Sequence, residues 1–165
     1  SDLSMGMLTV RGDLSSKAFK NAFEFELPDI LTIRNVNGMR VAWMSPDELL
    51  FLCTREEIKV LMSKFRAALK NQHSCVADVS DARCVFTLHG SKVREVVAKL
   101  APVAVAPGQF APGQIRRTRF GQIAAAFWMQ SEEEVKITCF RSFGSYMYKQ
   151  LCVSIAQGSE LDLWS

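Results

Sequence analysis

Four side chains near the middle of the sequence have the types and the spacing of metal ligands. They are His73, Cys75, Cys84 and His89, which give an H-x-C…C-x4-H pattern. A zinc site would require all four donor atoms to converge on one point. Side chains alternate along a strand, so His73 and Cys75 can share a face, but Cys84 and His89 would point to opposite faces. The pattern therefore favours two buried thiols and two polar histidines over a metal site.

The same region holds the residue types of a thiol hydrolase or transferase. A nucleophilic Cys84 would need a base such as His89 and an orienting acid such as Asp78 or Asp81. Asp81 follows Ser80 at a strand junction, where it is expected to cap a turn. No G-x-S-x-G elbow occurs, and the chain contains two histidines in all. A small thiol enzyme using Cys84 and His89 stays an alternative with no further support.

Other charged groups are explained by turns and sheet edges. Residues 132–134 (Glu-Glu-Glu) and Asp47–Glu48 occupy predicted corners between strands, where acidic side chains are expected to be solvated. No glycine-rich phosphate-binding motif is present. Arg117 and Arg119 share one face of a predicted strand and could meet an acidic partner or a polyanionic ligand. A sheet edge defended by charge is an equally good interpretation.

Composition narrows the class of protein. The 165 residues carry a net charge of +3 with no basic block, which argues against nucleic-acid binding. The five cysteines are odd in number, lie in apolar runs and form no C-x-x-C, so we expect buried thiols in a reducing compartment, the cytoplasm. No apolar stretch is long enough for a membrane span. Residues 1–7 are expected to be disordered or left over from cloning.

The elements that would position these groups occur twice in the same order. "VAWMSPDELLFLC" (Val41–Cys53) is similar to "AAFWMQSEEEVKITC" (Ala125–Cys139), and each follows a hairpin signal. Strand, glycine, helix, proline-containing loop, hairpin, strand and helix recur in residues 8–71 and 85–157. This order predicts an α+β fold, in which helices pack on antiparallel sheet and each unit is ferredoxin-like or a split β-α-β arrangement. We expect one domain over residues 8–157, followed by a C-terminal tail at 158–165.

Local signals refine the predicted elements. Thr54 and Glu57 form a T-x-x-E capping box at the start of a helix. Ser15 or Asp13 is the expected cap of the first helix, and Ser142 that of the last. The two tryptophans of the repeated phrase, at positions 43 and 128, are expected to be structural and to occupy equivalent places.

Three segments favour a protein partner. The last predicted helix is apolar nearly all round, whereas the surface helix of a monomer should have a polar face. The proline-rich loop between residues 101 and 116 is either an interaction arm or a mobile connection. The tail ends in apolar residues. The expected interface therefore combines this helix, the strand arginines and the tail, through Phe143, Tyr146, Met147, Tyr148, Leu151, Arg117, Arg119 and Trp164.

Four phrases carry a resemblance to a known family. They are D-V-S-D-A-R (Asp78–Arg83), the strand–glycine–helix step at Gly90, P-G-x…T-R-x-G (Pro112–Gly121) and W-M-S-P-D-E (Trp43–Glu48). With them, residues 8–156 resemble the gamma subunit of bacterial heterotetrameric sarcosine oxidase. That family is related to the aminomethyltransferase-like, folate-binding fold.

The resemblance implies a function carried by a complex. Such a complex demethylates sarcosine to glycine, reduces oxygen to hydrogen peroxide and passes the methyl carbon to tetrahydrofolate as a methylene group. It implies alpha, beta and delta subunits as partners. FAD, FMN, NAD and tetrahydrofolate would belong to the two large subunits and zinc to the smallest. The gamma chain would then hold no cofactor, no metal and no catalytic residue, and would brace the large subunits.

One alternative follows from the wider folate-binding family. A stand-alone folate- or one-carbon-binding protein of the aminomethyltransferase type would need a carboxylate in a deep pocket to hold the pterin. Asp78 and Asp81 are the nearest candidates.

Overall fold

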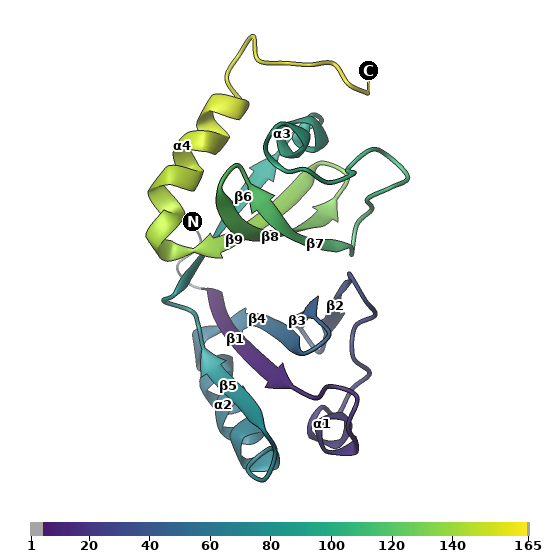
Figure 1. Cartoon of the computed structure of the whole chain (residues 1–165), viewed down its shortest axis with the longest axis vertical. Helices are drawn as coiled ribbons and strands as arrows, with labels where there is room; N and C mark the ends of the chain where they lie inside the picture. Colours follow the sequence, from purple (N-terminus) through teal and green to yellow (C-terminus); the bar gives the residue numbers. More distant parts are fainter. Residues whose placement is uncertain (1–4, 165) are drawn as a thin grey trace. The chain divides into compact units, whose positions relative to one another are not determined.

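The computed structural model describes residues 5–164, in which two antiparallel sheets carry helices (Figure 1). The prediction of an α+β fold is confirmed. The chain divides into two compact units, with the boundary between Asp81 and Ala82. The first strand begins at Met5, so residues 5–7, predicted to lie outside the fold, belong to the first sheet. The predictions for residues 1–4 and 165 lie outside the described residues.

The first unit is a five-stranded sheet with two helices. Its strands lie in the order β2-β3-β4-β1-β5, and all the pairings are antiparallel. Its elements are β1 (Met5–Gly12), α1 (Lys17–Ala22), β2 (Ile33–Val36), β3 (Met39–Ser45), β4 (Glu48–Thr54), α2 (Arg55–Ala68) and β5 (Ser74–Asp78).

The second unit is a four-stranded sheet with two helices and a short 3-10 turn. Its strand order is β6-β9-β8-β7, again antiparallel. Its elements are β6 (Arg83–His89), α3 (Val93–Leu100), β7 (Ile115–Phe120), β8 (Ile123–Ser131), β9 (Glu134–Phe140), η1 (Arg141–Phe143) and α4 (Gly144–Ser154).

The two units share one strand order, since β2-β3-β4-β1 corresponds to β7-β8-β9-β6. The registers agree as well. Arg11 lies opposite Glu48 as His89 lies opposite Glu134. Counted from these pairs, the helix after β4 is the counterpart of the helix after β9, so α2 and α4 occupy equivalent places.

The two tryptophans are not equivalent, contrary to prediction. Trp43 pairs with Leu49 and shares its face of the sheet, the face that packs against the helices. Trp128 lies beside Phe127, a residue of the second core, so alternation places it on the opposite face. The reason is one extra residue before the corner: Met44 alone separates Trp43 from Ser45, whereas Met129 and Gln130 separate Trp128 from Ser131, and Ser45 and Ser131 hold equivalent register positions. A shift of one residue reverses the face of a strand side chain.

The core of the first unit is rich in phenylalanine rings. The ring centroid of Phe23, just after α1, lies 5.0 Å from that of Phe65 of α2, in an edge-on arrangement, and 5.9 Å from that of Phe51 of β4. Such offset and edge-on pairs add to the stabilisation from burial. These rings attach both helices to one face of the sheet.

The predicted N-terminal caps of the helices are confirmed in one of three cases. The capping box on α2 is confirmed: Glu57 N donates to Thr54 Oγ1 (3.3 Å), and Thr54 N donates to Glu57 Oε2 (2.8 Å). The cap of α1 is Ser16 rather than Ser15 or Asp13. Ser142 does not cap the last helix, because the 3-10 turn precedes α4 and its N-cap position makes no side-chain bond.

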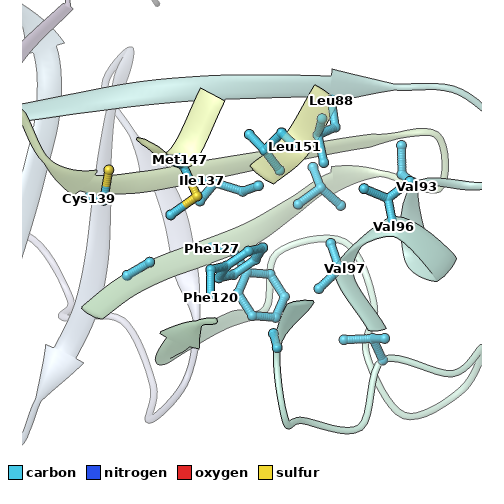
Figure 2. Packing of buried hydrophobic residues seen from close by; sticks show 14 of the residues in the cluster. Leu88, Val93, Val96, Val97, Phe120, Phe127, Ile137, Cys139, Met147 and Leu151 are labelled. Carbon is cyan, nitrogen blue, oxygen red and sulfur yellow. The ribbon is translucent and has the colours of Figure 1, made fainter. Parts of the chain in front are cut away.

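The core of the second unit lies between its sheet and the helices α3 and α4. Figure 2 shows Val93, Val96 and Val97 of α3 on one side and Met147 and Leu151 of α4 on the other. They converge on side chains of the strands, among them Phe120, Phe127 and Ile137.

A buried arginine fixes the proline-rich loop between α3 and β7. Arg94 is 7% exposed, and its Nη1 donates to the carbonyl oxygens of Val105 (2.9 Å) and Phe110 (2.6 Å). Its Nη2 donates to Glu132, at the tip of the β8–β9 hairpin. Val105 and Phe110 are themselves buried. The loop is therefore packed onto its own unit and is not a projecting arm.

We expect the Arg94→Ala variant to lose about 2–4 kcal/mol of unfolding free energy, because two buried carbonyls and Glu132 lose their donor. Chemical denaturation measures this loss. Lys92→Ala is the matched control: it removes an exposed ion pair with Asp162 and should cost less than about 1 kcal/mol. Equal losses in the two variants would contradict the role of Arg94 as an anchor.

The two units differ in how closely the equivalent helix approaches the first strand. A Cβ added at Gly6 of β1 would lie 2.5 Å from Ile58 Cγ1 and 2.8 Å from the Thr54 carbonyl oxygen. In the second unit Cys84 takes the place of Gly6, and Gly144 takes the place of Ile58. In the first unit the larger side chain is on the helix and the glycine is on the strand, and in the second unit this arrangement is reversed.

This exchange predicts opposite responses to one substitution. Gly6→Ala should destabilise the first unit by about 1–3 kcal/mol through overpacking. In Gly144→Ala the new Cβ would lie 3.4 Å from Cys84 Sγ, and alanine is the better helix former, so we expect no loss or a gain of up to about 1 kcal/mol. Thermal and urea denaturation of both variants test the pair, and equal losses would exclude the proposed exchange.

Candidate functional site

The four potential metal ligands are divided between the two units. His73 and Cys75 lie at β5 in the first unit, and both are exposed. In β6 of the second unit, Cys84 is buried, whereas His89 is exposed and lies 3.7 Å from Glu134. Within residues 5–164, no three histidine, cysteine or acidic side chains are grouped as a metal site requires. The prediction of buried thiols is confirmed for Cys84 and Cys139 and is wrong for Cys75, which is exposed on an edge strand, while Cys53 and Cys152 are half-buried.

The two aspartates weighed as catalytic or pterin-binding groups hold the end of the first unit together. Asp78 accepts hydrogen bonds from Ser80 N (2.9 Å) and Ser80 Oγ (2.5 Å). Ser80 Oγ in turn accepts from Met7 N (2.9 Å). Asp81 forms an ion pair with Arg55 (2.7 Å). The turn-capping role predicted for Asp81 therefore belongs to Asp78.

The acidic corner of the first unit combines an exposed and a buried carboxylate. Asp47 pairs with Arg11 at 2.9 Å, and the pKa of Asp47 is lowered, first by a hydrogen bond from Ser45 and then by Arg11. Glu48, however, is 4% exposed and accepts a hydrogen bond from Thr9 Oγ1 at 2.9 Å. The expectation of a solvated corner is thus wrong for Glu48, because register places it on a buried strand end.

Five large apolar side chains of α4 and of the residues at its two ends are exposed, and we name them together the α4 outer surface. Two of the residues predicted for the interface do not belong to it: Met147 and Leu151 are 0% and 4% exposed and pack on their own sheet. The α4 outer surface consists of Phe143 (47% exposed), Tyr146 (47%), Tyr148 (60%), Val153 (69%) and Ile155 (56%).

The equivalent helix of the first unit provides an internal comparison. The α2 helix buries Ile58 and Phe65 against its sheet, as α4 buries Met147 and Leu151. The outward side of α2 is mostly charged, and its exposed large apolar residue is Val60. The shared fold does not require an apolar outer side. The α4 outer surface is therefore a property of α4 itself.

The arginines of β7 have different surroundings. Arg117 and Arg119 are exposed on β7, the edge strand of the second sheet. Arg116, the second residue of β7, stacks over the ring of Phe110 in the proline-rich loop, with its Cζ 5.1 Å from the ring centroid. Arg116 therefore supports the loop, while Arg117 and Arg119 stay in the predicted interface.

The tail after α4 is held against α3 by three polar contacts, one of which runs from Lys99 Nζ to Ser159 Oγ (3.2 Å). Leu161 N donates to a Glu95 carboxylate oxygen, and Asp162 forms an ion pair with Lys92 (2.7 Å). Leu161, Leu163 and Trp164 stay largely exposed, as expected of a docking tail. Beside this contact lies a hollow of about 360 Å³ lined by residues of β6, α3 and the tail.

The Glu95 contact predicts a response to pH. The pKa of Glu95 is lowered from its ordinary value of 4.5 by the hydrogen bond from Leu161 N and by Lys99. A lowered pKa means that this stabilisation is present above pH 4.5 and is lost as the pH falls through the lowered value. We expect limited proteolysis at about Leu161 to accelerate in that acidic range. Glu95→Gln should abolish this pH dependence. The same pH profile of proteolysis in Glu95→Gln as in the unchanged chain would contradict the role of Glu95.

These features define a class of protein. Figure 1 shows a chain of two α+β units, and no described helix is long and apolar enough to cross a membrane. The fold is similar to that of glycine cleavage system aminomethyltransferase T from Bartonella henselae, with a TM-score of 0.67 at 13% identity, over 92% of this chain and 44% of that one. The fold is thus aminomethyltransferase-like.

The particular family follows from the sequence. Residues 11–157 match the family model of the sarcosine oxidase gamma subunit, and the chain belongs to that family. Sarcosine oxidase subunit gamma of Corynebacterium sp. (strain U-96) is 26% identical over 161 residues, which cover 96% of this chain and 78% of the relative. The resemblance inferred from the sequence is confirmed.

A solved structure supports the same fold. A chain of heterotetrameric sarcosine oxidase from Corynebacterium sp. U-96, in complex with pyrrole 2-carboxylate, superimposes with a TM-score of 0.84 at 24% identity. The match covers 97% of this chain and 84% of that one.

Proposed function

We propose that this chain is the gamma subunit of a heterotetrameric sarcosine oxidase and that its role there is structural. Family membership and the relative from Corynebacterium support the assignment. The polar groups of the described residues support a structural role, because Asp78, Asp81 and Glu48 each make contacts that hold the fold. The partners are the alpha, beta and delta subunits, in the cytoplasm of a bacterium.

The reaction belongs to the assembled complex. Sarcosine is oxidatively demethylated to glycine, oxygen is reduced to hydrogen peroxide, and the methyl carbon passes to tetrahydrofolate as a methylene group. FAD, FMN, NAD, tetrahydrofolate and zinc are held by the other subunits. The gamma chain contributes binding surface and no catalytic residue.

The α4 outer surface is the observation that carries this proposal. Aromatic side chains dominate the binding energy of protein interfaces, and here Phe143 of η1 and Tyr146 and Tyr148 of α4 are exposed. Removal of apolar area from water contributes roughly 25 cal/mol per Å². Arg117, Arg119 and Trp164, also exposed, are the further members of the proposed interface. A larger subunit that covers α4 would remove from water the one strongly apolar helix surface among the described residues.

Purification of the tagged chain from its native host tests the assignment. We expect a yellow eluate that contains two larger chains and one smaller, and that oxidises sarcosine with release of hydrogen peroxide. A colourless chain without partners would overturn the proposal. It would instead indicate a stand-alone folate- or one-carbon-binding protein, which a tetrahydrofolate titration would then detect.

A matched pair of variants tests the surface. Tyr146→Glu places a charge on the α4 outer surface, and Val60→Glu places one at the equivalent position of α2. We expect Tyr146→Glu to weaken assembly by at least about tenfold, since an unpaired charge in an interface costs more than 1.4 kcal/mol. Val60→Glu should leave assembly unchanged. Size-exclusion chromatography of the co-expressed subunits measures both, and equal behaviour would exclude α4 as the docking helix.

A further inference from the structure

Two cysteines of the second unit form a close thiol pair. Cys84 of β6 and Cys139 of β9 lie directly opposite each other in register, and their sulfur atoms are 3.7 Å apart. A disulfide bond measures about 2.05 Å. The two sulfurs therefore need to approach by less than ~2 Å to be joined. In the first unit the same register position pairs Gly6 with Cys53, so no such thiol pair exists there.

Cys84 can be reached from solvent through a hollow beside it. The hollow has a volume of about 480 Å³. Its lining consists of Cys84, Phe86, Arg141, Gly144, Ser145, Tyr148 and Lys149. In the first unit, the equivalent place of Gly144 is filled by the Ile58 side chain, which touches the strand. The glycine thus opens a path for a small solute to the thiol of Cys84.

The two thiols have different surroundings. Cys139 is 2% exposed and does not line the hollow, and burial, followed by the neighbouring Cys84, raises the pKa of Cys139 to about 12. Cys139 is therefore an uncharged thiol at neutral pH. Of the two sulfurs of the pair, Cys84 is the one that a small oxidant meets first, because Cys84 lines the hollow and Cys139 does not.

We propose that Cys84 and Cys139 form an oxidative modification site for small hydroperoxides. Cys84 attacks the peroxide, the O–O bond breaks, and the products are a sulfenic acid on Cys84 and one water. The Cys139 sulfur then displaces the hydroxyl group, so that a second water leaves and the S–S bond forms. In sum, two thiols are oxidised by two electrons and hydrogen peroxide is reduced to two waters. The proposal concerns the free chain, because a partner that covers Tyr148 would also cover the hollow.

The register makes the bond reversible. The Cβ atoms of directly opposed strand residues are about 4.5–5.5 Å apart, while a disulfide prefers about 3.5–4.5 Å. The strands must therefore close slightly, which strains the bond, and strained disulfides are the ones that thiols reduce readily. We expect glutathione to restore both thiols.

The test exposes the free, reduced chain to hydrogen peroxide, blocks the remaining thiols by alkylation and maps the peptides by mass spectrometry. The free chain is used because Tyr148 belongs both to the hollow and to the α4 outer surface. We expect the loss of two of the five free thiols, a linked peptide containing Cys84 and Cys139, and reversal by glutathione. Oxidation of other thiols first, or linkage only in denaturant, would overturn the proposal.

Variants separate the steps. Cys139→Ser should stop at a sulfenic acid on Cys84, which a cyclic 1,3-diketone traps, whereas Cys84→Ser should form neither product. Cys53→Ser is the matched control and should behave as the unchanged chain does. Gly144→Ala, expected to fold normally, should slow the oxidation severalfold by covering Cys84. An unchanged rate in Gly144→Ala would exclude access through the hollow.

Discussion

The arrangement of the second unit depends on one buried guanidinium. Arg94 binds two carbonyl oxygens of the proline-rich loop and the carboxylate of Glu132, and so joins α3, the loop and the β8–β9 hairpin. A buried arginine is stable only where its donors are matched. Those bonds hold Val105 and Phe110 in the core, and the loop that seals the core leads directly into β7. This anchor adds to the burial of Val105 and Phe110 and to the stacking of Arg116 on Phe110.

The two units show what one scaffold permits. Both place a helix on the same face of the sheet after equivalent strands, and both bury two or three side chains of that helix. Their outer sides have diverged, since one is mostly charged and the other is aromatic. Their inner contacts have diverged as well, through the exchange of Gly6 and Ile58 for Cys84 and Gly144. The features proposed to have a function lie where the second unit departs from the first.

Polar groups that looked chemical in the sequence serve the fold. Asp78 organises a turn with Ser80, Asp81 pairs with Arg55, and Glu48 is satisfied by Thr9. This use of carboxylates agrees with the proposal of a subunit whose contribution is binding surface. Helix α4 then presents its aromatic side chains outward, and the tail is tied to α3 close by in the same unit.

The sequence by itself determined the α+β class, the succession of strands and helices, the capping box at Thr54 and the family. These depend on local periodicity, on hydrogen bonds between near neighbours and on short phrases similar to those of the family, all of which are present in the linear sequence. Only the tertiary structure decided that Arg94 and Glu48 are buried, that α4 turns Met147 inward and that Cys84 faces Cys139. Register and burial arise from contacts between residues far apart in the chain. One extra residue between Trp128 and the β8–β9 corner was enough to place the two tryptophans on opposite faces.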